Sequence, residues 1–379
     1  MISLNKNQLK DNISQTCSAD LLTGHIGGAA VLVKQNGKTI YKDFFGSAGE
    51  GRETNEKTLF RLASMTKPIT AVAVLKEIGK GKLSLDSTVD EFIPEYAEMT
   101  LGDLDENGEI VVVGQSKSKI TVRHLLTHTS GIGSGKLCSK EDKLTVGAQT
   151  DLKSITDAYA KLPLSFEPYT AQAYSATVGF DILARIVETV SNKSYDRYLK
   201  EEIFEPLGMA DTTFAPTEEQ WERMTLMHSY EDGISSFAPL NKKTIFGGYP
   251  LTYFCGGAGL ASTLSDYEKF VDMLASRGKT ENGDQLIHAE LIDLMATPGE
   301  PFGISPSQRW GLSVRVITTD TNRIPKGSFG WSGAYGCHFW VDPTNNITAI
   351  YMKNSTFDRG SDAKTAAKLE ENVYSAFLS

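Results

Sequence analysis

The order of local patterns along the chain limits its fold more than any single motif does. Residues 30–33 and 39–41 read as two strands that flank the pair Asn36-Gly37, a strong short-range signal for a tight β-hairpin. Strand-like patterns return near the other end of the chain, at residues 310–317, 338–341 and 348–352. Strands at both ends around a helical middle predict one sheet that is built from the two chain ends.

Helical periodicity fills the region between these strands. From Ser64 onward, apolar residues recur at the spacing of a buried helix: Ile69, Val72, Leu75 and Ile78. Residues 181–190 place their apolar side chains on one face, and residues 266–275 and 363–377 also read as helices. These stretches predict a substantial helical part between the two halves of the sheet.

Together these patterns predict an α/β fold of the α+β type, an antiparallel sheet flanked by helices with an inserted, mainly helical domain. We expect residues 1–62 plus 255–379 to form the sheet domain and residues 63–254 to form the inserted domain. The seam between two such domains is a natural cleft. The active site is therefore expected there.

Charge and hydropathy limit the partners of the chain. Its 379 residues carry a formal net charge of -9 and no basic run stands out, which argues against nucleic acid as a partner. No run of apolar residues without a charge reaches eighteen residues, so no membrane span is expected. The polar N-terminal segment does not read as a signal peptide, and we therefore expect a cytoplasmic protein.

The cysteines indicate neither a zinc site nor a redox motif. The chain has four, widely spaced and without a CxxC pair: Cys17, Cys138, Cys255 and Cys337. Free thiols in a reducing cytosol are the simpler interpretation. Two disulfides are the alternative if a precursor carried a leader.

The first candidate for chemistry is Ser64, which stands three residues before Lys67 at the start of a predicted helix. That spacing places a hydroxyl and an amine on the same face within about one turn. A serine needs a partner to take its proton, and a neutral lysine amine can do so. Alone, however, this tetrapeptide is a weak signal, because a capping serine followed by a solvated lysine has the same spacing.

The order of several further motifs strengthens that signal. After the Ser64 tetrapeptide come residues 124–131 (HLLTHTSG), Tyr174-Ser175, residues 206–209 (PLGM), residues 256–260 (GGAGL), residues 330–333 (GWSG) and residues 341–343 (VDP). This succession resembles the class C β-lactamase-related family of serine hydrolases, which have the penicillin-recognising fold. The family also contains D-aminopeptidases, D,D-carboxypeptidases and carboxylesterases. The resemblance covers the chain from about residue 28 to residue 352.

The resemblance implies specific roles at the matching positions. Ser64 would be the nucleophile, Lys67 its proton partner and Tyr174 a second general acid/base. Residues 331–333 match the family's strand tripeptide, where Gly333 would let the substrate backbone approach the strand. The N–H groups of Ser64 and Ala334 would then hold the oxyanion.

Two departures from the family pattern point to esters. Trp331 stands where lactamases and peptidases have a basic residue that holds the substrate carboxylate, and Trp331-Ser332-Gly333 is closest to the Trp-x-Gly of family esterases. Ala176 stands where the family usually has an asparagine that binds the acyl amide. Without these polar groups, discrimination in favour of β-lactams and peptides should fall.

Other residues invite a functional interpretation that the pattern does not require. His124 and His128 are four residues apart, but no third ligand accompanies them, so we read them as structural and expect no metal. Tyr249, Tyr253 and Phe254 precede a glycine pair and can either line an apolar pocket or pack in the core.

The sequence therefore predicts a serine hydrolase that cleaves short-chain carboxylic esters through an acyl-enzyme on Ser64, without a cofactor or metal. Its substrate would be a small-molecule ester or a β-lactam-like compound. The nearest alternative is a β-lactamase or D-amino-acid peptidase of the same family. An alternative of another class is a non-catalytic ligand-sensing protein of this fold.

Overall fold

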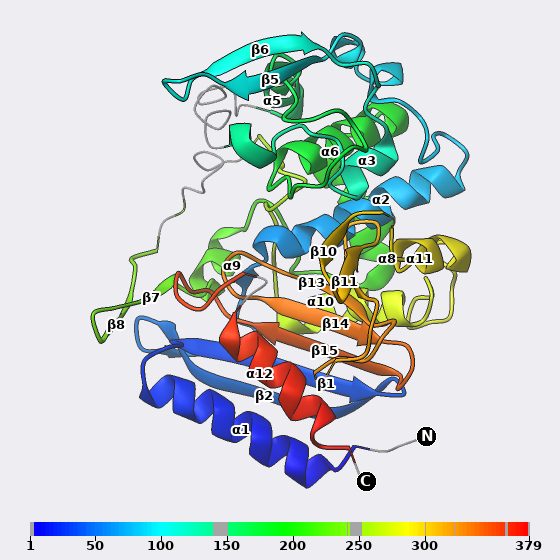
Figure 1. The fold of residues 1–379 in the computed structure, drawn as a ribbon. Coiled ribbons are helices and arrows are strands. Elements are labelled where there is room, and N and C mark those ends of the chain that lie inside the picture. The colour runs from blue at the N-terminus through cyan, green and yellow to red at the C-terminus, as the bar shows by residue number, and fades with distance from the viewer. Residues whose placement is uncertain are drawn as a thin grey trace.

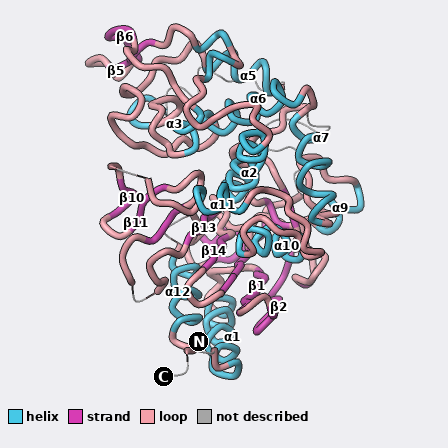
Figure 2. Tube along the Cα trace, turned by 90° about the vertical axis from the view of Figure 1, so that its right-hand side faces the viewer, coloured by secondary structure: helices cyan, strands magenta, loops and turns pink. Residues whose placement is uncertain are grey.

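The computed structural model of the protein describes residues 4–138, 151–240, 242, 252–299, 301–321, 323–360 and 363–377. Tyr249, one of the residues considered for an apolar pocket, lies outside the described residues. Figure 1 shows a sheet with helices on both faces, and a second, largely helical part above it. The view turned by 90° shows the same two parts one above the other (Figure 2).

One antiparallel sheet unites the two ends of the chain, as predicted. Within the described residues it has nine strands, in the order β10-β11-β12-β13-β14-β15-β1-β2-β3. The junction of the two ends is the pair β1 and β15, in which Ala30 lies opposite Met352. The strands are β1 (Gly28–Gln35), β2 (Lys38–Gly49), β3 (Arg52–Glu53), β10 (Gly303–Ser305), β11 (Gln308–Trp310), β12 (Arg315–Ile317), β13 (Phe329–Ser332), β14 (His338–Asp342) and β15 (Ile347–Met352).

The predicted hairpin between the first two strands is present. Asn36 and Gly37 form its two-residue loop with φ angles of 52° and 72°. Such loops need positive φ at both positions, which asparagine and glycine tolerate best. The local turn chemistry therefore determines how β1 and β2 pair.

One predicted strand is wrong. Residues 310–317 were expected to form a single strand, but the chain turns between β11 and β12. Gly311 N–H donates to the Val314 carbonyl at 2.8 Å, and Ser313 has a φ of 73°. A glycine next to a residue with positive φ breaks an extended strand, so the apolar residues of this segment belong to a turn that packs on the core.

Helices cover both faces of the sheet (Figure 1). The first and last helices, α1 (Lys6–Leu22) and α12 (Lys364–Tyr374), lie together on one face, and α10 (Leu264–Ala275) lies on the other. The sequence patterns had not predicted α1, because it is a polar helix that buries only Leu9, Ile13 and Cys17. Those three residues are four apart, so they form one narrow apolar stripe.

The remaining elements connect the sheet to the helical part and build that part. They are β4 (Phe60–Arg61), α2 (Thr66–Gly79), β5 (Thr100–Leu104), β6 (Ile110–Gln115), α3 (Val122–Leu126), α5 (Leu152–Tyr159), α6 (Val178–Ser191), α7 (Tyr195–Leu199), α8 (Glu205–Leu207), α9 (Glu218–Arg223), β7 (His228–Glu231), β8 (Ile234–Phe237), β9 (Ala261–Ser262) and α11 (Ala289–Met295). The helix expected at residues 181–190 is α6. The hairpins β5–β6 and β7–β8 were not predicted.

The helix α2 lies between the sheet and the upper helical part (Figure 1). Its apolar residues Ile69, Val72 and Leu75 are fully buried, and it packs against α6. The two-part architecture confirms the predicted fold class. The division into residues 1–62 plus 255–379 and residues 63–254 stays a prediction.

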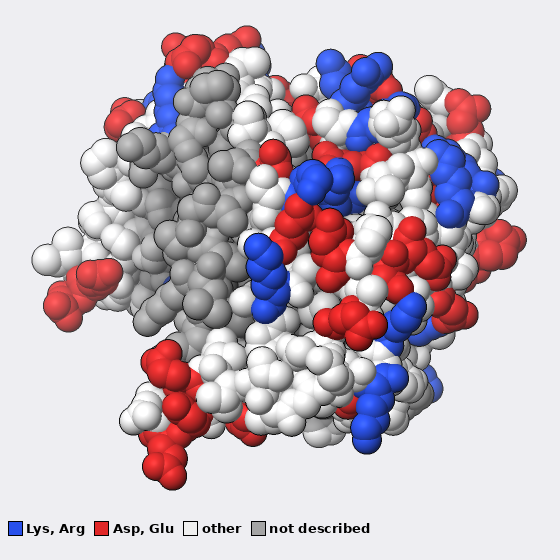
Figure 3. Space-filling model, turned by 90° about the horizontal axis from the view of Figure 1, so that it is seen from above, with Lys and Arg blue, Asp and Glu red and all other residues white. Residues whose placement is uncertain are grey.

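Three further features of the described residues are the length and polarity of the helices, the charges on the surface and the state of the cysteines. Each described helix is either too short or too polar to cross a lipid bilayer. Seen from above, the face in Figure 3 carries acidic and basic side chains next to one another, without a broad basic area among the described residues. Cys17, Cys255 and Cys337 are buried and form no disulfide.

A buried ionic network joins α12 to the sheet. Glu370 accepts hydrogen bonds from Arg315 on β12 at 2.9 Å, and its carboxylate lies 3.0 Å from Nε2 of His338 on β14. Burial alone raises the pKa of Glu370, but the contacts with His338 and Arg315 outweigh burial and hold that pKa at about 2. The carboxylate is therefore ionised at neutral pH and stabilises the packing of α12.

We predict that Glu370→Gln lowers the free energy of unfolding at pH 7 by about 3–5 kcal/mol, because it leaves buried Arg315 without its counter-charge. A pKa below the unfolded value means that this stabilisation is present above about pH 4.5 and is lost as pH falls toward 2. Denaturant unfolding at several pH values measures it. The exposed neighbour Glu371 is the control: Glu371→Gln should cost less than about 1 kcal/mol. Equal losses for both variants would contradict the prediction.

Candidate active site

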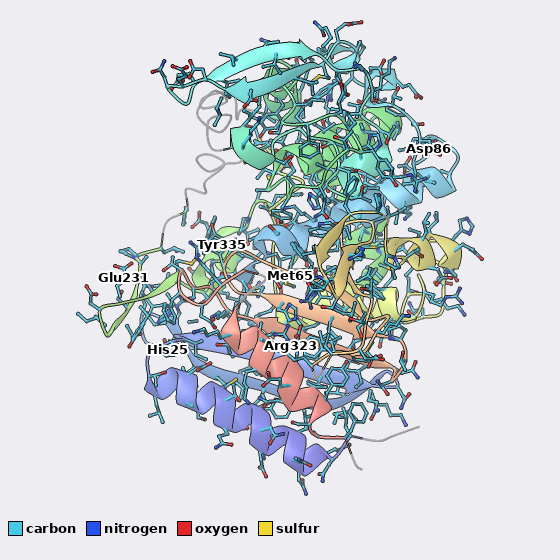
Figure 4. All side chains as sticks on the ribbon, viewed as in Figure 1. His25, Met65, Asp86, Glu231, Arg323 and Tyr335 are labelled. Carbon is cyan, nitrogen blue, oxygen red and sulfur yellow. The ribbon has the colours of Figure 1, made fainter. Side chains whose placement is uncertain are left out.

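Ser64 lies on a sharp turn between β4 and α2. The preceding residue, Ala63, has a φ of 45°, a left-handed conformation that costs a non-glycine residue roughly 1 kcal/mol. A single 3-10 turn, Ala63–Met65, follows, and α2 begins at Thr66. Leu62 N–H donates to the Leu260 carbonyl at 2.9 Å and holds the start of the turn. Figure 4 places Met65, next to Ser64, where the helical part meets the sheet.

The Lys67 amine is in contact with the Ser64 hydroxyl. Nζ lies 3.1 Å from Ser64 Oγ, and the side chain is fully buried. Nζ also donates to the carbonyl oxygens of Ala176 at 2.5 Å and Gly257 at 2.8 Å. No carboxylate of the described chain lies within 4 Å of it. This excludes the solvated lysine that the Ser64 tetrapeptide alone would allow.

The three contacts fit both protonation states of this amine. An ammonium group has three N–H donors, one for each oxygen. A neutral amine has two N–H donors for the two carbonyls, and its lone pair is then directed at the Ser64 hydroxyl. The arrangement can therefore accept a proton from Ser64 and later return it without moving any heavy atom.

Asp181 on α6 holds the glycine turn that carries the Gly257 carbonyl. This buried carboxylate accepts a hydrogen bond from Gly256 N–H at 2.9 Å and another from the Tyr253 hydroxyl. Burial raises the pKa of Asp181 to about 6. Gly256 itself lies against α6: an added Cβ would be 2.3 Å from the Phe180 carbonyl oxygen. The glycine turn is thus held next to α6, which brings Gly257 to Lys67.

Tyr174 lies beside Lys67 in an aromatic cluster. Its ring centroid is 5.1 Å from Lys67 Nζ, and the residue is 36% exposed. The ring stacks on Trp310 at 5.8 Å and contacts Trp331 at 5.5 Å. Trp310 and Trp331 also contact each other at 4.4 Å. These contacts hold the phenol at the edge of the site, where it can reach a bound substrate.

His128 is buried beneath this cluster. Its Nδ1 accepts a hydrogen bond from Ser175 N–H at 3.1 Å, and its ring contacts Tyr174 at 4.7 Å. Burial, reinforced by the charge of Lys67, lowers the pKa of His128 well below its ordinary value, so the imidazole is neutral. It therefore supports the Tyr174 segment. His124 Nδ1 accepts from Thr121 N–H at 3.1 Å, and the described residues contain no cluster of acidic, histidine and cysteine side chains that could hold a metal.

Two backbone N–H groups near Ser64 have no acceptor in the described part of the chain. They belong to Ser64 and to Ala334, and both residues line the same cavity. The turn after β13 is closed by bonds from Gly333 N–H to the Cys337 carbonyl at 2.7 Å and from Gly336 N–H to the Gly333 carbonyl at 2.9 Å. The arrangement leaves these two donors available to an oxygen of a bound molecule.

The residues predicted on β13 lie on opposite faces of the sheet. Trp331 faces Tyr174 and is 7% exposed. The Ser332 hydroxyl points toward the face covered by α12 and lies 2.8 Å from Nδ1 of His338 on β14, which contacts Glu370 of α12. Successive side chains of a strand alternate in this way. The Trp331 side chain therefore faces the site, and the Ser332 side chain faces away from it.

A largely apolar cavity of about 400 Å³ opens at Ser64. Among its described lining residues, one side chain is charged, that of Arg61. The apolar lining includes Ala176, Phe214, Trp221, Met224, Leu226, Met227, Leu240, Leu260 and Ala334. Tyr253 and Phe254 do not line this cavity. Tyr253 is buried against Asp181, and Phe254 packs against Phe214.

Three residues of the site were missed by sequence reasoning. Trp310 was read as part of a strand, Asp181 as part of a helix face, and Arg61 was not considered. A charged residue within an otherwise apolar helix face was a usable signal for Asp181. Arg61 and Trp310 had no such signal, because only the folded chain turns the Arg61 side chain into the cavity and brings Trp310 to Tyr174.

Comparison with known proteins agrees with this geometry. A family model described as Beta-lactamase matches residues 11–372. The chain belongs to the Beta-lactamase family. This is a family of β-lactamase-fold serine hydrolases with esterase and peptidase members, as the sequence motifs indicated.

Several members of the Beta-lactamase family align with almost the whole chain. Esterase EstB of Burkholderia gladioli is 28% identical, over 92% of this chain and 90% of its own. A putative D-alanyl-D-alanine carboxypeptidase of Escherichia coli is 26% identical, over 90% and 81% respectively. The solved structure of EstCE1, a hydrolase with promiscuous acyltransferase activity, has a TM-score of 0.82 at 22% identity and covers 97% of this chain and 99% of its own.

We predict that Gly333→Ala slows acylation of Ser64 about 10²–10³-fold, the usual effect of losing one oxyanion donor. An added Cβ would lie 2.2 Å from the Leu62 carbonyl oxygen, so the β13 turn and the Ala334 N–H must shift. The rate of labelling by a fluorophosphonate measures the effect. Gly114→Ala, on β6 where an added Cβ meets nothing within 4 Å, is the control and should label normally. An unchanged labelling rate for Gly333→Ala would argue against the role of Ala334.

Proposed function

We propose that this member of the Beta-lactamase family is a carboxylesterase that hydrolyses short-chain esters through a covalent acyl-enzyme on Ser64. The observation that carries the proposal is the buried contact of 3.1 Å between Lys67 Nζ and Ser64 Oγ. A serine hydroxyl becomes an effective nucleophile when an adjacent base takes its proton. The two carbonyls on Nζ support that arrangement by directing the third position of the amine at Ser64.

Acylation would begin when Ser64 Oγ attacks the ester carbonyl carbon and its proton passes to the neutral Lys67 amine. The carbonyl oxygen becomes an oxyanion, which the N–H groups of Ser64 and Ala334 stabilise. The ester C–O bond then breaks, and the leaving alkoxide takes a proton from Lys67 or from Tyr174. The products of this half-reaction are an alcohol and an ester of Ser64.

Deacylation repeats these steps with water in place of Ser64. Lys67 or Tyr174 accepts a proton from the water as the oxygen attacks the acyl-enzyme carbonyl. The same two N–H groups stabilise the second oxyanion, and Ser64 Oγ leaves with the proton returned to it. The carboxylic acid departs and the site regains its first state, with no cofactor or metal in the cycle.

Two positions support an ester rather than a β-lactam or peptide as substrate. Ala176 contributes its backbone carbonyl to Lys67 but has no amide side chain for an acyl amide. Trp331 packs against Tyr174 and Trp310 and provides no cation for a carboxylate. Polar recognition supplies most of the discrimination available to such a pocket, so both residues favour simple esters.

A β-lactamase or peptidase remains the alternative, since relatives of the chain include a putative carboxypeptidase. The intact contact between Lys67 and Ser64 counts against the non-catalytic alternative. We also propose a cytoplasmic protein, which the buried thiols of Cys17, Cys255 and Cys337 support. A small-molecule ester is its proposed partner.

We predict that Ser64→Ala and Lys67→Ala each lower the turnover of p-nitrophenyl butyrate at least about 10³-fold. The double variant should be little worse than either, because both residues act as one nucleophilic unit. Lys38→Ala, which removes an exposed lysine on β2, is the control for loss of a lysine in general. Near wild-type turnover by Lys67→Ala at neutral pH would contradict the role of its amine.

We predict that the wild-type enzyme prefers p-nitrophenyl butyrate over nitrocefin by well over tenfold in kcat/KM. Each missing polar contact, at Ala176 and at Trp331, should cost a β-lactam about 1–3 kcal/mol that a simple ester never gained. Ala176→Asn combined with Trp331→Lys should narrow the preference by improving acylation by nitrocefin. Because Trp331 is buried, thermal unfolding is measured alongside, and Ala176→Asn alone should narrow the preference in part. If the wild type hydrolysed nitrocefin faster than p-nitrophenyl butyrate, the esterase assignment would be wrong, and a β-lactamase or peptidase assignment would replace it.

A further inference from the structure

The Arg61 guanidinium is a charged group on the wall of an apolar cavity. Arg61 lies in β4, three residues before Ser64, and lines the same cavity. Its Nη1 donates to the Thr225 carbonyl at 3.2 Å, and the guanidinium lies 5.8 Å from the centroid of the Trp221 ring. All other described lining side chains are uncharged. The cavity therefore combines an apolar wall with one cation.

No carboxylate of the described residues neutralises this cation. Every ion pair formed by the described residues leaves Arg61 out, and one of its five N–H donors is used by a carbonyl. Burial lowers the pKa of Arg61, and the electrostatic effect of the nearby Tyr335 phenol offsets only part of the desolvation of the charge. A partly buried charge without a counter-ion is destabilising, and a ligand carboxylate would relieve that cost with two parallel hydrogen bonds.

Hydrogen bonds that do not involve the Arg61 side chain also hold the main chain of β4. Asn354, which follows β15, makes two hydrogen bonds to the Arg61 backbone: Arg61 N–H donates to Oδ1 at 2.8 Å, and Nδ2 donates to the Arg61 carbonyl at 2.9 Å. These two bonds hold the main chain at residue 61 without using its guanidinium. The guanidinium is thus available for another role.

The position of Tyr174 identifies which part of an ester enters the cavity. Tyr174 and Lys67 would protonate the leaving alcohol, so the alcohol lies on their side of Ser64. The described lining of the cavity includes Ser64 and Ala334 but neither Tyr174 nor Trp331. An acyl-enzyme carbonyl held by the N–H groups of Ser64 and Ala334 then directs its acyl chain away from Tyr174 and into the cavity.

We propose that the acyl chain of the substrate carries a carboxylate at its far end, which Arg61 binds across the apolar cavity. The substrate class is thus a monoester of a dicarboxylic acid: methylene groups contact residues such as Trp221, Met224 and Leu226, and the terminal carboxylate pairs with the guanidinium. This inference rests on the proposed esterase function. Arg61 determines which ester is preferred and takes no part in the bond-breaking steps.

The test compares p-nitrophenyl hydrogen adipate with p-nitrophenyl hexanoate, two esters with acyl chains of equal carbon number. Wild-type kcat/KM should be at least about tenfold higher for the adipate, as one charge-assisted contact provides. The preference should shrink as NaCl is raised, because salt screens a partly exposed ion pair. Spontaneous hydrolysis is subtracted for each ester.

Variants of Arg61 test whether the preference for the adipate depends on the charge of its side chain. Arg61→Gln should lower kcat/KM for the adipate about tenfold more than for the hexanoate, mainly through KM, and Arg61→Lys should restore part of the ratio. Arg52→Gln is the matched control: Arg52 is partly buried and donates to the Met224 and Glu222 carbonyls, but it does not line the cavity. The ratio of its kcat/KM for the adipate to its kcat/KM for the hexanoate should equal the wild-type ratio.

The possible outcomes separate this inference from the proposed function. Hydrolysis of hexanoate with no preference for adipate, or a preference that Arg61→Gln leaves intact, overturns the inference and leaves the esterase function standing. Hydrolysis of neither ester, with Ser64 unlabelled by a fluorophosphonate, overturns both. If Arg61→Gln fails to fold, the inference is tested by the wild-type ratio of kcat/KM for adipate to kcat/KM for hexanoate and by its salt dependence. A ratio near one at low salt overturns the inference.

Discussion

The site depends on holding the Lys67 amine in the interior of the protein. Removing a lysine charge from water is costly, and no carboxylate of the described residues lies within 4 Å to offset that cost. Two backbone carbonyls, of Ala176 and Gly257, replace the lost water instead. They leave the position on Nζ that faces Ser64 for the exchange of a proton. Much of the surrounding structure can be understood as the means of bringing these two carbonyls to one nitrogen.

Close approaches of main chain to main chain bring these groups together. Gly256 lies against the Phe180 carbonyl of α6, and Gly333 lies against the Leu62 carbonyl just before the Ser64 turn. An added Cβ at either position would clash with that carbonyl oxygen, at 2.3 Å and 2.2 Å respectively, so the elements would have to move apart. The first approach places Gly257 next to Lys67, and the second places the Ala334 N–H beside Ser64. Gly256 thus connects the helical part to the nucleophile through Gly257 and Lys67. Gly333 connects the turn that carries Ser64 to the sheet.

Local patterns predicted those elements whose conformation depends on neighbours in sequence. The hairpin at Asn36-Gly37 was predicted because its two residues tolerate positive φ, and α6 was predicted because its apolar residues share one face. The strand expected at residues 310–317 was wrong because an apolar run looks the same in a strand and in a buried turn. The polar helix α1 was missed because three buried residues in seventeen give little periodicity.

The sequence by itself determined the chemistry that is available: a serine and a lysine one helical turn apart, a tyrosine, and a tripeptide with a glycine next to Ala334. Motif order was enough for this, because those roles depend on side-chain identity and on spacing within one element. The tertiary structure alone decided that backbone carbonyls hold Lys67, that the Ser332 hydroxyl faces α12, and that Arg61 lines the cavity. A carbonyl is the same at every residue, and the direction of a side chain depends on which face its element buries. Neither property leaves a mark in the sequence.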